Sequence, residues 1–142
     1  MLPDIYIYAS VFATSFLAST ILPLGSEGVV ALAIRSGHNA VIIVLIASVG
    51  NFLGSLTNYY VGYYGEKTIL SRLIKITEKD IHKAKKYFDR HGSPILFFSW
   101  LPIVGDALTL FAGIIRADLK RFTFFVFTGK LARYIAIAFI FG

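Results

Sequence analysis

Four charged residues stand in long apolar stretches of this chain, where ionised groups are costly. Glu27 ends the run "LPLGSE" and Asp106 ends the run "LPIVGD", each four residues after a proline. Lys130 and Arg133 lie three residues apart in another apolar stretch, and therefore on one helical face. Such residues could form two structural ion pairs, or they could line a wet cavity that holds an anionic group or a proton. Both interpretations stay open from the sequence.

Two amides belong to the same candidate site. Asn51 and Asn58 lie seven residues apart in an apolar stretch, so they face the same side of a helix. Asparagine at membrane depth either bonds neighbouring helices together or contacts a substrate, and the sequence favours neither role. No zinc-ligand cluster, nucleotide-binding loop or catalytic triad is recognisable, so we predict no catalytic residue, no metal site, no cofactor and no enzyme activity.

The composition predicts an integral membrane protein. Hydrophobic residues make up 56% of the 142 residues and charged residues 15%, and a soluble domain of this size could not bury so much apolar surface. The net charge of +6 does not indicate nucleic acid, because eight of the fourteen Lys and Arg residues fall between Lys67 and Arg90. That concentration is typical of a loop beside anionic lipid. We expect a single membrane domain over residues 1–142.

Four apolar stretches must position the charged residues. Residues 40–64 and 119–141 are long enough to cross a bilayer. Residues 5–34 and 94–115 are interrupted by helix-breaking residues, namely Pro23, Gly25, Pro102 and Gly105. We predict that each interrupted stretch forms a re-entrant helical hairpin, with its acid at the start of the second half-helix. Whether residues 5–22 instead cross the membrane fully stays open.

A sequence repeat predicts how these elements are arranged. "GSLTNY" (residues 54–59) follows Glu27, and "GKLARY" (residues 129–134) follows Asp106, with acid-to-glycine spacings of 27 and 23 residues. Each unit, about 4–65 and about 93–142, then contains one hairpin and one crossing, so the second unit is inverted relative to the first. In this arrangement most basic residues gather on one face, which places the linker, about residues 66–92, in the cytoplasm.

The linker has the pattern of an amphipathic helix. Thr77 and Asp80 form a capping-box pattern, and Gly92 followed by Pro94 is a stop signal. One helical face is apolar and carries Ile81, Ala84 and Phe88. We expect this helix to lie on the membrane surface, with a plain solvated helix as the alternative.

The quoted motifs resemble those of a known family. "PLGSEGVVALAIRSG", "GNFLGSLTNYYVGYYG", "YFDRHGSPILFFSWLPIVGDALTLFAGIIR" and "GKLARYIA" are similar to the DedA superfamily of SNARE-associated or VTT-domain membrane proteins, and to its short YqaA-like branch. The resemblance implies two re-entrant hairpins that meet at the membrane midplane, and maps the acid of the first hairpin onto Glu27. The larger branch carries arginines in its second hairpin, where this chain has Trp100 and Asp106; Lys130 and Arg133 could supply the missing positive charge.

The resemblance implies lipid transport. We expect a multi-pass protein of the bacterial inner membrane that flips or scrambles an anionic phospholipid or a polyprenyl phosphate between leaflets, with or without coupling to protons. The alternatives are a proton-coupled carrier of a small ion, and a membrane scaffold or assembly factor that transports nothing. A homo-oligomer is compatible with the sequence, and no nucleic-acid partner is expected.

Overall fold

The structure, a computed structural model, describes residues 2–20, 26–65, 77–101 and 104–141, and every regular element in these ranges is a helix. The predicted break residues Pro23, Gly25 and Pro102 lie outside the described residues. The elements, in chain order, are α1 (Leu2–Ala18), α2 (Glu27–Arg35), α3 (Ala40–Tyr64), α5 (Glu78–His91), the 3₁₀ helix η1 (Ser93–Trp100), α6 (Val104–Ile114) and α7 (Leu119–Phe141).

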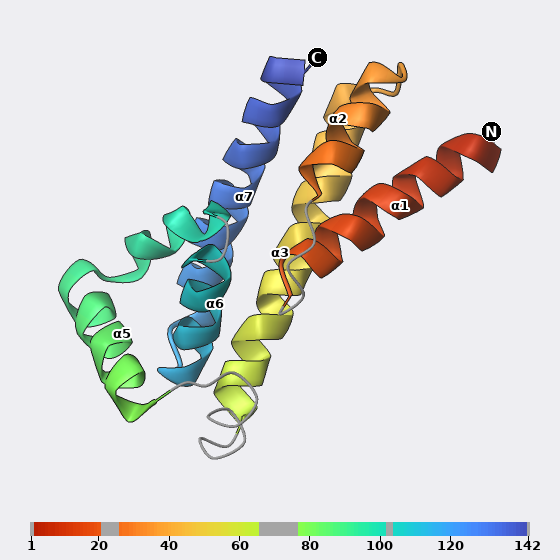
Figure 1. The fold of residues 1–142 in the computed structure, drawn as a ribbon. Coiled ribbons are helices and arrows are strands. Elements are labelled where there is room, and N and C mark those ends of the chain that lie inside the picture. Colours follow the sequence, from red (N-terminus) through yellow and green to blue (C-terminus); the bar gives the residue numbers. More distant parts are fainter. Residues whose placement is uncertain (1, 21–25, 66–76, 102–103, 142) are drawn as a thin grey trace.

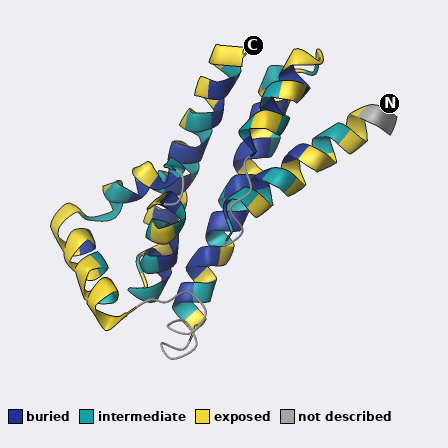
Figure 2. Ribbon diagram, viewed as in Figure 1, coloured by how far each residue is buried: buried dark blue, intermediate teal, exposed yellow. Residues whose placement is uncertain are grey.

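The two predicted spans form the longest helices. α3 and α7 are long and apolar enough to cross a membrane, and both begin and end where the sequence predicts. The side chain of Asn39 caps α3 by accepting a hydrogen bond from the Val41 N–H at 2.9 Å. Many large apolar side chains stay exposed, including Phe139 at 91% and Leu32 at 68%. Exposed positions alternate with buried ones along α3 and α7 (Figure 2). An apolar exterior of this kind fits a lipid environment.

Both interrupted stretches are divided into two helical segments. α1 is followed by the shorter α2, and η1 by α6 (Figure 1). α2 and α6 both begin near the middle of the molecule and run toward opposite ends of the bundle. Gly105 lies in the first turn of α6 and not in the break itself, which corrects the sequence prediction. Its absent side chain allows α6 to approach η1, because a Cβ at Gly105 would collide with the Ser99 carbonyl.

The four segments pack on α3 and α7 in a crosswise pattern. Within each half of the chain, α1 packs on α3 and η1 packs on α7. Between the halves, α2 contacts α7 and α6 contacts α3. Glycines allow the first two contacts: a Cβ at Gly54 would strike the Phe16 carbonyl of α1, and a Cβ at Gly129 would strike the Phe97 carbonyl of η1. One apolar core surrounds Tyr134 and the other surrounds Phe122.

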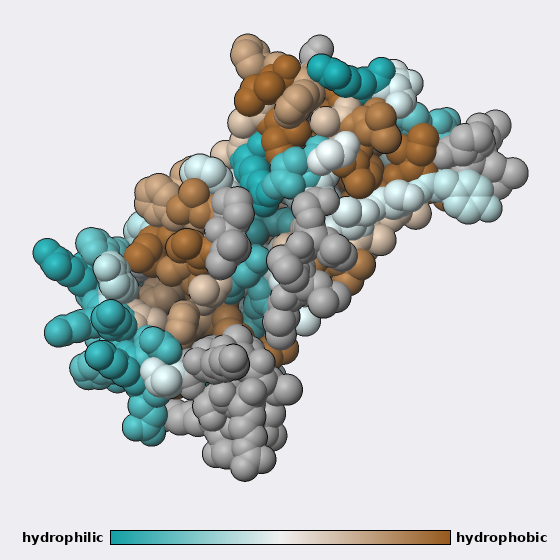
Figure 3. All heavy atoms as spheres, in the orientation of Figure 1, coloured by the Kyte–Doolittle hydropathy of each residue, from teal (hydrophilic) through white to brown (hydrophobic). Residues whose placement is uncertain are grey.

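α5 forms where the linker pattern predicts it. Thr77 and Asp80 make the complete capping box, and the last helical residue precedes Gly92, whose φ is +71°. Phe88 is only 7% exposed and belongs to the core around Phe122. The apolar face of α5 is therefore at least partly occupied by the protein, and hydrophilic side chains gather on the outer surface over this helix (Figure 3).

Loss of the capping box is expected to loosen α5. Thr77→Ala removes the N-cap hydroxyl, and amide exchange in α5 is expected to become about fivefold faster. The backbone N–H and hydroxyl of Thr77 donate to Asp80 and hold the pKa of this carboxyl below its usual 3.8. The stabilisation is therefore complete above pH 3.8 and is lost as the pH falls through the folded-state pKa. Hydrogen-exchange mass spectrometry against pH checks this; in Asp80→Asn this pH dependence should be absent.

Candidate functional site

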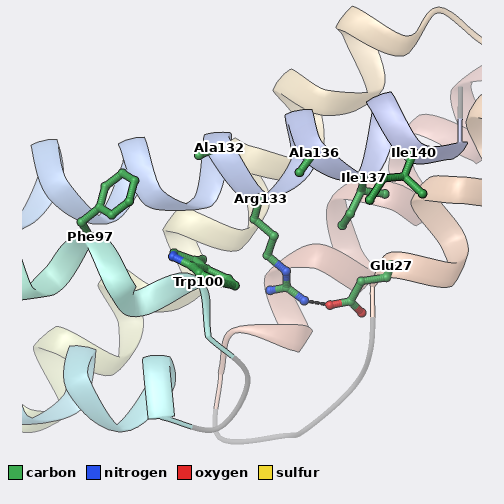
Figure 4. Close-up of a pocket in the computed structure, with 8 residues that line it drawn as sticks. All are labelled: Glu27, Phe97, Trp100, Ala132, Arg133, Ala136, Ile137 and Ile140. Carbon is green, nitrogen blue, oxygen red and sulfur yellow. Dashed lines mark ion pairs between the residues drawn. The ribbon is translucent and has the colours of Figure 1, made fainter.

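Glu27, the first predicted acid, forms an ion pair with α7. Glu27 is the first residue of α2, and its Oε1 contacts an Nη of Arg133 on α7 (Figure 4). The Arg133 side chain is 16% exposed and that of Glu27 41% exposed. Next to this pair, the Ser26 and Tyr134 hydroxyls are hydrogen-bonded at 2.6 Å. Two adjacent polar contacts therefore join the start of α2 to α7.

The second acid faces the other predicted cation. Asp106 lies in the first turn of α6 and Lys130 on α7, and the two charges interact electrostatically without a direct ion pair between these described residues. Lys130 is only 1% exposed. Because Lys130 and Arg133 are neighbours on one helical face, the four predicted charges form two couples that meet on α7.

A pocket lies beside the Glu27–Arg133 pair. Its volume is about 410 Å³, within the range of ligand-binding pockets. Apart from the ion pair its walls are apolar or aromatic, and they come from η1 and α7: Phe97, Trp100, Ala132, Ala136, Ile137 and Ile140 (Figure 4). Ile140 is 71% exposed, so the pocket reaches the apolar outer surface of α7. The ion pair lies between the aromatic side chains of η1 and the isoleucines of α7 (Figure 4), and a charged pair inside an apolar pocket suits an amphiphile.

The two asparagines face the protein interior rather than this pocket. The Asn51 amide donates to the Ser15 carbonyl of α1 at 2.8 Å, and the Asn58 amide donates to the Ser19 carbonyl at 2.6 Å. Asn58 also lies 3.3 Å from the Thr109 hydroxyl, which itself donates to the Asp106 carbonyl. Both amides therefore bond helices together, and Asn58 reaches the Asp106 side of the site.

Two kinds of residue escaped the sequence analysis. The sequence singled out Trp100 only because it replaces an arginine of the larger branch, yet it lines the pocket next to Phe97. Ser26 and Tyr134 were inside the repeated motifs and received no role of their own. The signal that could have singled them out is their position, because each adjoins a predicted charged residue.

Comparisons with known proteins identify the family. Residues 22–141 match the VTT domain. This chain belongs to the VTT-domain family. An inner membrane protein of Escherichia coli, YqaA, is 38% identical over 91% of this chain and 87% of that protein. An uncharacterized protein of Haemophilus influenzae is 34% identical over 91% of this chain and 83% of that protein. These matches confirm the resemblance to the DedA superfamily.

A more distant relative carries a functional name. Undecaprenyl phosphate transporter A of Staphylococcus aureus is 25% identical over 82% of this chain and 63% of that protein. No solved structure matches this chain. The VTT-domain relatives named as membrane proteins agree with the apolar exterior and the two long apolar helices of this chain.

Proposed function

We propose that this VTT-domain protein moves an anionic lipid with a phosphate headgroup between the leaflets of the bacterial inner membrane. The observation that carries the proposal is the pocket of about 410 Å³ that surrounds Arg133 with apolar walls and reaches the outer surface at the exposed Ile140. A lipid must keep its chains in the bilayer while its headgroup crosses, so a laterally open pocket fits it better than a closed aqueous pore would. The transporter name of the Staphylococcus aureus relative points to the same ligand chemistry.

The proposed architecture is an inverted repeat of a re-entrant hairpin and a crossing helix, with repeats over about 4–65 and 93–142. The crosswise packing supports it, because α1 lies on α3 as η1 lies on α7, and α2 meets α7 as α6 meets α3. The glycine contacts support it too: Gly54 and Gly129 occupy the same place in the two motifs, and each touches the preceding hairpin. The charge bias favours a cytoplasmic linker.

Arg133 is the proposed headgroup ligand. A guanidinium presents donors in a planar fork that matches phosphate oxygens, and its charge persists at any physiological pH. In this structure the Glu27 carboxylate is paired with the Arg133 guanidinium, so an incoming phosphate must displace this carboxylate. Protonation of Glu27 would release Arg133 to the lipid, which is one way for protons to be coupled to transport. Lys130 and Asp106 are proposed to balance charge at the adjoining position.

The test is lipid translocation in reconstituted vesicles. The protein is placed in liposomes that contain a fluorescent phosphatidylglycerol, and a membrane-impermeant quencher is added outside. We expect protein-dependent loss of inner-leaflet fluorescence. It should be slower in Asp106→Asn but faster in Glu27→Gln, whose neutral amide leaves Arg133 free for the phosphate. A fluorescent zwitterionic lipid serves as the matched control and is expected to move more slowly, because it offers no net negative charge to Arg133.

Two results would contradict the proposal. Fluorescence loss equal to that of empty liposomes, with correctly folded protein, would exclude translocation of this lipid class. Equal translocation rates for the native protein and all variants would mean that the predicted site residues take no part in translocation. If an entrapped pH dye then responds to the protein while lipids do not move, a proton-coupled small-ion carrier replaces the lipid transporter. If neither assay responds, a scaffold role gains support.

A further inference from the structure

Tyr134 on α7 adjoins both sides of the Glu27–Arg133 ion pair without being part of it. Its hydroxyl is hydrogen-bonded at 2.6 Å to the Ser26 hydroxyl, and Ser26 directly precedes Glu27. The Arg133 guanidinium carbon lies over the Tyr134 ring, 5.6 Å from its centroid, which is within reach of a cation–π attraction. From there Arg133 extends to Glu27 (Figure 4). One side chain is therefore in a position to hold the carboxylate and the guanidinium together.

Ser26 gives up its capping role for this contact. As the N-cap of α2, a serine would normally accept a hydrogen bond from a backbone N–H of the first turn, with an extended backbone. Ser26 makes no such side-chain bond, and its φ of −97° and ψ of −13° lie in the helical region. It is 1% exposed, and its hydroxyl is bonded to Tyr134. The start of α2 is therefore tied to α7 by a bond that replaces the usual local one.

The Tyr134 side chain is a fixed point on α7. It has no exposed surface and lies in the core that also contains Val30 of α2 and Val44 of α3. Side chains in close-packed cores sit in well-defined rotamers. The Glu27 side chain, by contrast, is 41% exposed, so packing alone does not hold it against α7. The hydrogen bond between Tyr134 and Ser26 supplies the restraint that packing does not.

The matching tyrosine of the first motif makes a different contact. Tyr59 ends "GSLTNY" as Tyr134 ends "GKLARY", but the Tyr59 hydroxyl donates to the Ala117 carbonyl at 2.6 Å. Ala117 follows the end of α6, whereas Asp106 lies in its first turn. Asp106 interacts with Lys130 electrostatically, without a direct ion pair between these two described residues. The acid whose helix start is bonded to a tyrosine is therefore the acid that is directly paired.

We propose that Tyr134 is a positioning residue whose hydroxyl, acting through Ser26, holds the Glu27 carboxylate on the Arg133 guanidinium. Without this bond the first turn of α2 is free to move, and Glu27 leaves Arg133 more often. Tyr134 thereby sets how readily Arg133 becomes available to a phosphate headgroup. This last consequence rests on the proposed function, whereas the positioning of Glu27 does not.

Labelling of Glu27 by dicyclohexylcarbodiimide tests the positioning directly. The full-length protein in detergent is treated with this carboxyl reagent, and the modified Glu27 peptide is quantified by mass spectrometry. The ion pair shields Glu27, so we expect Tyr134→Phe to speed labelling about fivefold, the effect of one lost hydrogen bond. Ser26→Ala removes the other half of the same bond and should give the same increase. The double variant should label no faster than either single one.

Tyr59→Phe is the matched control, because it removes the same hydroxyl and a hydrogen bond of the same 2.6 Å length. It should leave the labelling of Glu27 unchanged. Native labelling rates in both Tyr134→Phe and Ser26→Ala would overturn the proposal. An equal increase in Tyr59→Phe would overturn it too, because the effect would then be a general loosening of the fold. So would additive effects in the Ser26→Ala/Tyr134→Phe double variant.

Translocation of the fluorescent phosphatidylglycerol tests the consequence for transport. Tyr134→Phe should speed translocation, because Arg133 is then paired with Glu27 for less of the time. On a Glu27→Gln background the same substitution should have no further effect, because the hydroxyl acts through the carboxylate. A full effect of Tyr134→Phe on that background would overturn the proposed regulation of Arg133. If the native protein moves no lipid, the proposed function fails, and the labelling of Glu27 still decides the positioning role.

Discussion

Replacing Arg133 by glutamine is expected to slow translocation of the fluorescent anionic lipid by about 10- to 100-fold. Hydrogen bonds to a charged partner contribute about 1.5–3 kcal/mol, and each 1.4 kcal/mol is a factor of ten. Glutamine keeps part of the length and polarity of the side chain but offers neither the charge nor the fork that a phosphate fits. The translocation rate of Arg133→Lys should lie between those of the native protein and Arg133→Gln, because lysine keeps the charge but not the planar fork. The initial rate of inner-leaflet quenching measures the effect.

The matched control for Arg133 is another arginine of α7. Arg121 is 71% exposed and lies 3.8 Å from Asp118 at the start of the helix. Arg121→Gln removes the same charge from the same helix, and we expect translocation to stay within about twofold of native, since exposed ion pairs contribute little. Equal losses in the two variants would indicate a general charge effect, and a native rate in Arg133→Gln would exclude Arg133 as the headgroup ligand.

A single added methyl group at Gly129 is expected to disrupt the packing of η1 on α7. Its Cβ would overlap the backbone carbonyl of Phe97, and backbone cannot move aside as a flexible side chain can. Overpacking typically costs about 1–3 kcal/mol and sometimes more, a large part of a typical folding free energy of about 5–15 kcal/mol. Gly129→Ala should therefore lower the thermal midpoint and the yield of monodisperse protein in size-exclusion chromatography.

The control for Gly129 is another glycine within a helix. Gly28 lies in α2, and a Cβ there would meet nothing within 4 Å. Gly28→Ala should leave stability unchanged or raise it by up to about 1 kcal/mol, because alanine is the better helix former. If both variants were equally stable, close approach at Gly129 would not be a requirement of the fold.

The helices were largely predictable because each carries a local signal. Residues 40–64 and 119–141 had to be continuous helices, since both are apolar and lack an internal proline. The start of α5 was predictable from Thr77 and Asp80, whose side chains act only on backbone groups within one turn. Family membership was equally accessible, because the quoted motifs extend over nearly the whole chain.

The site could be predicted only as a set of charges. The sequence placed Lys130 and Arg133 on one face, but whether Glu27 pairs with the former or the latter depends on how α2 and α6 approach α7. The pocket was hidden for the same reason, because its walls come from η1, α7 and the start of α2. The hydrogen bond from the Ser19 hydroxyl to the Asn51 carbonyl was out of reach too, because the two residues lie 32 positions apart in the chain.

The 3₁₀ winding of η1 couples the length of this segment to the rotation of its residues around the helix axis. Eight residues of 3₁₀ helix, Ser93–Trp100, span about 16 Å, whereas the same residues wound as α-helix would span about 12 Å. Rewinding would also turn Trp100 by about 140° around the axis relative to Ser93. Trp100 lines the pocket, and η1 lies between α5 and α6 in the chain. Rewinding η1 as α-helix would therefore change the pocket wall and bring α5 and α6 closer by about 4 Å. Spin labels on these two helices would report this change as a shortened distance.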